Sequence, residues 1–377
     1  MRRSANEYLR KSSLIKMLHP VELTRELIRQ QSVLGSEHAI AKQIHNLISP
    51  YSSKVYLEDI GDGRENVIAF GKGKGRRTVL LNAHMDTVEV MNNWIHNPFG
   101  AEEEDGKIYG LGACDMKSGL AIFISLYSAF SQQDLNLIFT ACADEEGDSL
   151  GAYTLIQYMR EKNINPDVVL ISEPTNERVM LGARGRVVFE IEVKGRSAHG
   201  ARPHLGINAI MDAGKILGVF EKLPLPEHDK LGIGSFCPLK ISGGSSSLSV
   251  PEECRIILDR HYVLGETQEG IRMDIVKAIE ALGLRSSVRV EFVKRKVPFL
   301  KPYVCEENEL VSMFREIASS DVTYGQSVGD FNLFGELWPT IVYGCKGGNW
   351  HSGEEFVEIN SISHTYDTYS RFLSMLV

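Results

Sequence analysis

The chain has 377 residues, which is enough for two or three domains of ordinary size. Its 41 Lys and Arg and 49 Asp and Glu give a formal net charge of −8, and this balance argues against a nucleic-acid-binding protein. A hydrophobic fraction of 43% with 24% charged residues excludes a disordered chain and a fibre. No apolar run is long enough to cross a bilayer, so we expect no membrane partner. The six cysteines form no CxxC pair, which favours reduced thiols and a cytoplasmic location.

Residues 1–16 are basic and lack the apolar core of a signal peptide. We interpret them as a disordered extension. Two alternatives stay open: an organelle transit peptide, and a translation start at Met17, just before the first helical pattern.

From residue 20 to about residue 182 the sequence alternates helical and strand-like segments. Apolar residues at helical spacing predict amphipathic helices around 23–28 and 40–48. Short apolar runs at 78–81, 135–141 and 168–171 predict strands buried on both faces, with helices at 117–130 and 150–160 between them. The glycine-rich stretch 71–77 lacks the Walker spacing and precedes a strand, so we interpret it as a turn and not as a phosphate loop.

The pattern changes near residue 184. Strands are predicted at 187–193, 234–241, 253–260 and 288–293, with helices at 208–222 and 267–282. This βαββαβ order is that of a ferredoxin-like domain. After about residue 297 the α/β pattern resumes, with a helix at 307–318, a strand at 340–343 and a final helix from Ser361. We therefore predict one α/β domain, formed by 17–183 and 298–377, that is interrupted by an inserted domain over 184–297.

Acidic and histidine residues follow the predicted strands at five places. In open α/β sheets ligands bind beyond the carboxyl ends of the strands, so these residues are expected to converge. Each has a simpler interpretation: Asp115 suits a helix N-cap, and the neighbouring Glu145 and Glu146 suit a solvated surface. The candidates are His84 and Asp86 after the first strand, Asp115 before a helix, Glu145 and Glu146 after the second strand, Glu173 after the third, and His351 after the fourth.

Together these side chains form a ligand set that divalent metals of borderline hardness accept. On an extended strand His84 and Asp86 point to the same side, so the carboxylate can accept the second imidazole N–H and fix the tautomer of a metal-bound histidine. An aspartate can bridge two metals through its two oxygens, and a metal pair can polarise a carbonyl and activate water. The residues alone favour a metal site and no more.

The motifs NAHMDTV, GACDMKSG, DEEGDSLGA and SEPT, in this order, closely resemble those of the M20 metallopeptidase and aminoacylase family. This family includes acetylornithine deacetylase, succinyl-diaminopimelate desuccinylase and related carboxypeptidases. The resemblance extends from about residue 20 to the C-terminus, and GRSAHGARPHLGINAI at 195–210 is similar to the family signature of the inserted domain. It implies a zinc-peptidase-like catalytic domain with a mixed central sheet, interrupted by a ferredoxin-like dimerisation (lid) domain.

The resemblance also implies roles for individual residues. Two Zn²⁺ ions per chain are expected, with Co²⁺ as a possible substitute. Glu145 would be the general base, Asp86 the partner of His84, and His199 an oxyanion stabiliser that reaches the active site of the other subunit of a homodimer. The Asp115–Met116 bond matches a cis peptide of the family. The implied metal ligands are Asp115 as the bridge, His84 and Glu173 on one metal, and Glu146 and His351 on the other.

The substrate pocket departs from the family pattern. His261 stands where relatives carry an arginine tied to the substrate carboxylate, so Arg260 and Arg184 become further candidates for that contact. Lys346 is a candidate contact for an acidic group of the substrate or a solvated loop residue.

The implied activity is hydrolysis of a small N-acyl amino acid. The stretch NNWIHNPFG at 92–100 is close to the acetylornithine deacetylase and desuccinylase branch, which makes N-acetylornithine, N-acetyl-lysine or N-succinyl-diaminopimelate the expected substrate. Three alternatives stay open: an M20-type dipeptidase or carboxypeptidase, a non-catalytic binding protein that keeps the fold, and a cysteine hydrolase that uses Cys114 or Cys142.

Overall fold

The computed structural model describes residues 18–377, so the interpretations of residues 1–16 and of a start at Met17 lie outside the described residues. The chain forms two compact units. The first comprises the residues up to Leu181 together with Cys305–Thr323 and Leu337–Val377, and the second comprises Gly182–Val304 and Tyr324–Glu336. The domain boundaries at 183/184 and 297/298 stay a prediction. No helix within 18–377 is both long and apolar enough to cross a membrane.

A mixed central sheet, which the family resemblance implies, lies mostly in the first unit, and only residues 182–183, 303–304 and 324–325 of its strands belong to the second unit. Its strands in spatial order are β1 (Lys54–Gly61), β2 (Arg64–Phe70), β6 (Asn136–Cys142), β3 (Thr78–His84), β7 (Val168–Ile171), β17 (Thr340–Val342), β8 (Val179–Ala183) and β15 (Tyr303–Val304), with β16 (Val322–Gly325) also paired to β8.

The four strands at the centre of this sheet run parallel. They are short, apolar and buried, as expected for strands that are covered on both faces. Their register aligns the last residues: Ala83 pairs with Ala141, and both Asn82 and Val342 pair with Ile171. Because parallel strands end at one edge, the loops that follow β3, β6, β7 and β17 meet there.

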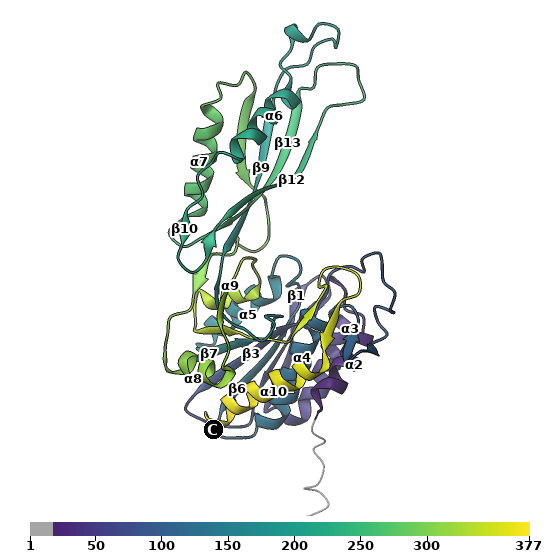
Figure 1. Cartoon of the computed structure of the whole chain (residues 1–377), viewed down its shortest axis with the longest axis vertical. Helices are drawn as coiled ribbons and strands as arrows, with labels where there is room; N and C mark the ends of the chain where they lie inside the picture. Colours follow the sequence, from purple (N-terminus) through teal and green to yellow (C-terminus); the bar gives the residue numbers. More distant parts are fainter. Residues whose placement is uncertain (1–17) are drawn as a thin grey trace, which may run out of the picture. The chain divides into compact units, whose positions relative to one another are not determined.

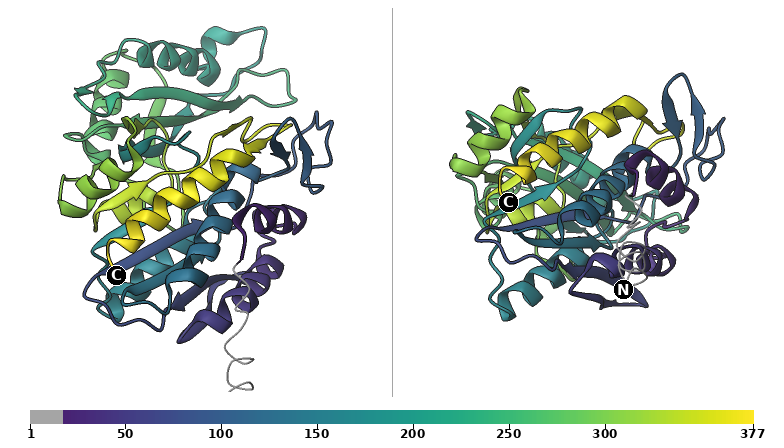
Figure 2. Two further views of the ribbon diagram at one scale, coloured as in Figure 1. Left: turned by 60° about the horizontal axis from the view of Figure 1, so that its bottom comes forward. Right: turned by 90° about the horizontal axis from the view of Figure 1, so that it is seen from below.

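Helices cover the sheet of the first unit. They are α2 (Pro20–Arg29), α3 (His38–Ile48), α4 (Ser118–Phe130), α5 (Leu150–Glu161), α8 (Glu309–Ala318) and α10 (Ile359–Ser374). Helix α4 packs on β3 and β6, and α2 and α10 pack on α4, with the yellow α10 lying along it in both views (Figures 1 and 2). Nearly every residue of α4 is therefore buried, which explains why its sequence is apolar on all sides.

A small second sheet in the first unit connects distant parts of the chain. Its order is β18 (Gly347–Gly348), β19 (Phe356–Glu358), β5 (Lys107–Tyr109) and β4 (Glu102–Glu104), all antiparallel. It joins the segment before α4 to the segment before α10. This pairing holds the loop with His351 next to the turn with Asp115.

The second unit contains the predicted βαββαβ motif. Its elements are β9 (Gly185–Lys194), α6 (Ala209–Phe220), β12 (Ser235–Gly243), β13 (Glu253–Tyr262), α7 (Gln268–Glu280) and β14 (Ser287–Phe292), with a short β10–β11 hairpin (Glu227–His228 and Gly232–Ile233) and α9 (Asp330–Gly335). The strand order β12-β13-β9-β14, antiparallel throughout, is the ferredoxin-like order. Helices α6 and α7 cover one face and close a core of apolar side chains (Figure 1).

Candidate metal centre

The predicted metal ligands of the first unit lie together at the carboxyl edge of the parallel strands. His84 is the last residue of β3, Glu146 lies in the loop after β6, and Glu173 follows β7. His351 lies in the loop after β17, and Asp115 lies in the turn that leads into α4. Five side chains from segments far apart in the sequence thus meet at one place.

Asp115 is at the centre of this cluster. Its Oδ1 lies 3.2 Å from Nε2 of His84, and its Oδ2 lies 3.3 Å from Nε2 of His351. Glu146 Oε1 lies 3.0 Å from the same nitrogen of His351, and Glu173 Oε1 lies 3.7 Å from Nε2 of His84. Each oxygen of the Asp115 carboxylate thus has an imidazole beside it, and a second carboxylate lies next to each imidazole. A pair of cations bridged by one carboxylate requires this arrangement.

The donor set fits divalent cations. Ligand atoms of His84, Asp115 and Glu146 lie within 4.8 Å of one another. Glu173 Oε1 is buried, and no hydrogen-bond donor among the described residues satisfies it. Burial raises the pKa of Glu173 well above its ordinary value, and the nearby Asp115 carboxylate raises it further. A cation between the two carboxylates would remove this repulsion.

His351 competes for the same carboxylates as a metal would. Hydrogen bonds to Asp115 and Glu146 raise the pKa of His351 to about 10, so the ring holds a proton that a metal ion must displace. A metal-bound imidazole is neutral at the ligating nitrogen. A metal ion bound at this nitrogen would therefore displace a proton.

Asp86 supports both sides of the cluster. The backbone carbonyl of Asp86 lies 3.0 Å from Nδ1 of His84, whereas its carboxylate Oδ1 lies 3.7 Å from that atom. The carboxylate instead accepts the backbone N–H groups of Glu145 and Glu146, at 3.2 and 3.0 Å. The imidazole partner is thus the main chain of Asp86, and its side chain fixes the loop of the two glutamates.

Glu145 is half-buried beside the cluster, and its negative charge acts on His84. Its neighbour Glu146 points to His351. Asp144, which precedes these two glutamates, has a positive φ of 70°. Its carboxylate stabilises the loop by accepting the backbone N–H groups of Asp148 and Leu150. Arg64, itself buried, donates to Asp144 at 2.6 Å. The sequence analysis missed both Asp144 and Arg64.

The loop that carries His351 is held from two sides by adjacent glutamates that the sequence analysis also missed. Glu354 accepts the backbone N–H groups of Ile95 and His96 and bonds to the ring of His96 at 2.7 Å. Glu355 is 1% exposed and binds the turn with Asp115. The sequence gives no signal that Glu355 binds this turn, because its partners are backbone N–H groups some 240 residues away.

The peptide bond between Asp115 and Met116 is cis, which confirms the expectation from the family resemblance. The alternative role of Asp115 as a helix cap is wrong, because α4 begins at Ser118 and the Asp115 carboxylate points to two imidazoles.

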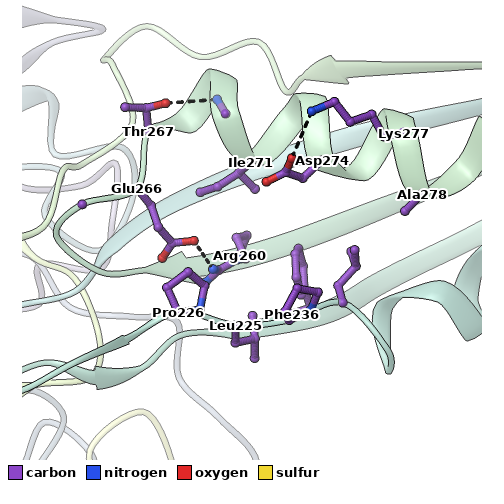
Figure 3. A pocket seen from close by; sticks show the side chains of 14 residues that line it. Leu225, Pro226, Phe236, Arg260, Glu266, Thr267, Ile271, Asp274, Lys277 and Ala278 are labelled. Atoms are coloured by element: carbon purple, nitrogen blue, oxygen red, sulfur yellow. Dashed lines mark hydrogen bonds and ion pairs between the residues drawn. The ribbon is translucent and has the colours of Figure 1, made fainter.

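The predicted substrate contacts lie in the second unit. Arg260 is 1% exposed and pairs with Glu266, and its guanidinium lies 4.8 Å from the ring centre of Phe236. These three residues line a cavity of about 810 Å³ beside α7 (Figure 3). His261 points to the opposite face of β13, as strand alternation requires, and lies 3.7 Å from Asp259. Arg184 bonds to the carbonyl of Leu231, and no described carboxylate lies within ion-pair distance of its guanidinium.

His199 lies in the loop after β9 and is exposed. The backbone N–H of Ala201 donates to Nδ1 of His199 at 3.1 Å. The neutral ring must then carry its proton on Nε2. In this tautomer Nε2–H is a hydrogen-bond donor. Lys346, the other candidate for an acidic substrate group, pairs with Glu177 at 2.7 Å.

Comparison with known proteins agrees with this architecture. The model of the peptidase family M20/M25/M40 matches residues 80–375. Succinyl-diaminopimelate desuccinylase of Cereibacter sphaeroides is 28% identical over 386 residues, which cover 94% of this chain and 98% of the relative. Aminopeptidase PepT from Bacillus cereus superposes with a TM-score of 0.77 at 19% identity, over 96% of this chain and 99% of that structure. The YXEP protein of Bacillus subtilis, described as a dinuclear metal-binding peptidase, superposes with a TM-score of 0.71 at 15% identity, over 95% and 97%.

The family match and the named relatives indicate a hydrolase that acts on amide bonds. The chain belongs to the M20/M25/M40 peptidase family.

Proposed function

We propose that this chain is a two-metal amidohydrolase that removes the acyl group from a small N-acyl amino acid. The observation that carries the proposal is the position of Asp115, whose two oxygens face two different histidines. Zinc is the expected metal and cobalt a substitute, since two imidazoles and three carboxylates suit borderline ions.

Bound metal ions would polarise the amide carbonyl and lower the pKa of a water molecule. His84 and Glu173 would hold one ion, Glu146 and His351 the other, and Asp115 both. Glu145, half-buried beside the cluster, would take the proton of the attacking water and deliver it to the leaving amine. Asp86 keeps Glu145 in place through the backbone N–H.

The tetrahedral oxyanion needs a further donor, and we assign it to Nε2–H of His199. The hydrogen bond from Ala201 to Nδ1 supports this role because it selects the tautomer that donates from Nε2. The family resemblance implies that this histidine acts in the site of a partner subunit.

A homodimer through the inserted domain has support from its surface. Strand β12 is the edge of its sheet, and its Leu239 and Ile241 are 54% and 49% exposed. Helix α6 packs next to β12 and exposes Met211 at 64%. An unpaired edge strand beside exposed apolar side chains is a template for pairing with a second copy.

Arg184 is the candidate that suits the substrate carboxylate best. Arg260 already pairs with Glu266 and His261 lies beside Asp259, whereas Arg184 has no such counter-ion among the described residues. We expect Arg184→Met to raise KM for N-acyl amino acids by about tenfold or more, since charge-assisted hydrogen bonds contribute roughly 1.5–3 kcal/mol. Arg186→Met, which removes a cation that pairs with Asp259, is the control. An unchanged KM in Arg184→Met would exclude this contact.

The first experiment is metal analysis combined with a substrate panel. Purified protein should contain up to two divalent ions per chain and should hydrolyse one of N-acetylornithine, N-acetyl-lysine and N-succinyl-diaminopimelate. Dipeptides in the same panel test the rival activity, an M20-type dipeptidase or carboxypeptidase. Full activity after complete removal of metal would contradict the proposal, and loss of activity only on thiol alkylation would favour the cysteine-hydrolase alternative. Metal binding without hydrolysis of any member would favour the binding-protein alternative.

A further inference from the structure

Glu355 is a buried carboxylate outside the expected ligand set. It is 1% exposed, and it accepts three backbone hydrogen bonds from a single turn. Oε2 accepts the N–H of Gly112 at 2.8 Å, and Oε1 accepts the N–H groups of Cys114 and Asp115, both at 2.9 Å. Its backbone carbonyl also accepts the N–H of Gly110, at 3.0 Å. Glu355 thus binds four backbone N–H groups of the turn that presents Asp115, including that of Asp115 itself.

The turn has few alternatives to this arrangement. Gly112 has a φ of +74°, and a Cβ at this position would lie 2.5 Å from Cγ2 of Thr87. The next basic residue along the turn, Lys117, is fully buried and donates to the carbonyl of Gln30 at 2.8 Å. A buried carboxyl group whose oxygens accept three backbone N–H groups is a rigid anchor, because its loss would leave those buried N–H groups unsatisfied.

Glu355 also belongs to the loop of a second expected ligand. His351 lies four residues earlier, and its Nε2 lies 3.3 Å from Asp115 Oδ2. The chain between the two residues is short, so a shift of Glu355 relative to the turn moves His351 relative to Asp115. The anchor therefore fixes the distance between a terminal ligand and the bridging ligand.

We propose that Glu355 is a positioning residue that sets the spacing of Asp115 and His351 and thereby the affinity for metal. This inference rests on the proposed metal centre. It predicts that the replacement of Glu355 weakens metal binding although Glu355 touches no metal itself. Loss of a group that orients a ligand typically lowers metal affinity by about 10- to 100-fold.

The test compares the metal dissociation constants of the wild type and of Glu355→Gln by competition with a chelator, together with the absorption spectrum of the Co²⁺-loaded proteins. The glutamine keeps one acceptor oxygen but turns an N–H₂ group toward backbone donors. Asp167→Asn is the matched control, because Asp167 also accepts a backbone N–H, from Thr78 at 2.7 Å, but at the opposite end of the strands. Circular dichroism of each metal-free protein establishes that it is folded.

We expect Glu355→Gln to bind Co²⁺ at least tenfold more weakly than the wild type, with an altered spectrum, and Asp167→Asn to match the wild type in both. Equal affinity and spectrum in wild type and Glu355→Gln would overturn the inference, while absence of metal binding in the wild type would overturn the proposed function instead. If Glu355→Gln does not fold, Glu355→Asp, which keeps both acceptors on a shorter side chain, replaces it. A wild-type spectrum and affinity in the folded Glu355→Asp would equally overturn the inference.

Discussion

Carboxylates in the candidate site act in two different ways. Asp115, Glu146 and Glu173 point their oxygens at histidines, whereas Asp86 and Glu355 point theirs at backbone N–H groups. The second group holds the loops of the first in place. The motifs identify the first group, because ligand chemistry restricts the residue type at each position. The second group depends on contacts that only the folded backbone creates, which is why Glu355 could not be predicted.

At the scale of the residue, Glu145 and Glu146 are neighbours with separate roles. We expect Glu145→Gln to lower kcat by about 10²- to 10⁴-fold, because an amide cannot accept the proton of water, while the metal content stays unchanged. Steady-state kinetics and metal analysis of the same preparation measure both quantities. Glu146→Gln, the matched variant one residue away, should instead lose metal. Near-normal turnover of Glu145→Gln would exclude Glu145 as the base.

The secondary structure elements differ in how far the sequence predicts them. The continuous apolar runs of β3, β6 and β7 and the helical spacing in α2 to α7 predict these elements with small errors at their ends. The β1–β2 hairpin was missed although Asp62-Gly63 is a turn signal between two strand-like segments. The short strands β4, β5, β18 and β19 carry no such pattern, because pairing between distant segments defines them.

At the scale of the element, Asp212 connects α6 to the segment before β14. It accepts the N–H of Ser286 at 3.2 Å and pairs with Lys215 at 2.8 Å. Burial raises the pKa of Asp212, but the hydrogen bonds from Lys215 and Ser286 outweigh it, so that the pKa lies below its ordinary value. A carboxyl with a lowered pKa stabilises the fold above its unfolded pKa of about 4, and this contribution is lost as the pH falls through the folded pKa.

We therefore expect Asp212→Asn to lower the protection of α6 amides from hydrogen exchange by about tenfold at pH 7, equivalent to about 1.4 kcal/mol, and by much less at pH 3. Exchange measured by mass spectrometry, with each variant compared to the wild type at the same pH, removes the pH dependence of chemical exchange. Asp274→Asn on α7 is the control, since its carboxylate is exposed and lies 3.7 Å from Lys277. An equal loss of protection at both pH values would refute the role of the charge.

At the scale of the whole molecule, the expected ligands come from both parts of the first unit, since His84 to Glu173 precede the inserted unit and His351 follows it. The ion that Glu146, Asp115 and His351 would hold links the two parts. A ligand at about 1,000 times its dissociation constant stabilises the folded state by about 4 kcal/mol. We expect dialysis against a chelator to lower Tm by several degrees and Zn²⁺ to restore it, as followed by calorimetry. An identical Tm before and after metal removal would contradict a shared site.

A second prediction at this scale concerns the dimer. His199→Ala and Glu145→Gln should each be nearly inactive, but mixing and reassembly of the two variants should recover part of the activity, because one hybrid site receives both wild-type residues. Measured activity after mixing, with each variant reassembled alone as the control, tests this. No recovery in a preparation that light scattering shows to be dimeric would place His199 in the site of its own chain.

The order of the segments also has a consequence for biosynthesis. Both His351 and Glu355 follow the entire second unit in the sequence. A nascent chain on the ribosome therefore exposes four of the proposed ligands long before His351 emerges from the exit tunnel. These four are His84, Asp115, Glu146 and Glu173. On the proposed ligand set, such an intermediate holds the ligands of one ion, whereas the second ion can bind only once the segment with His351 has emerged.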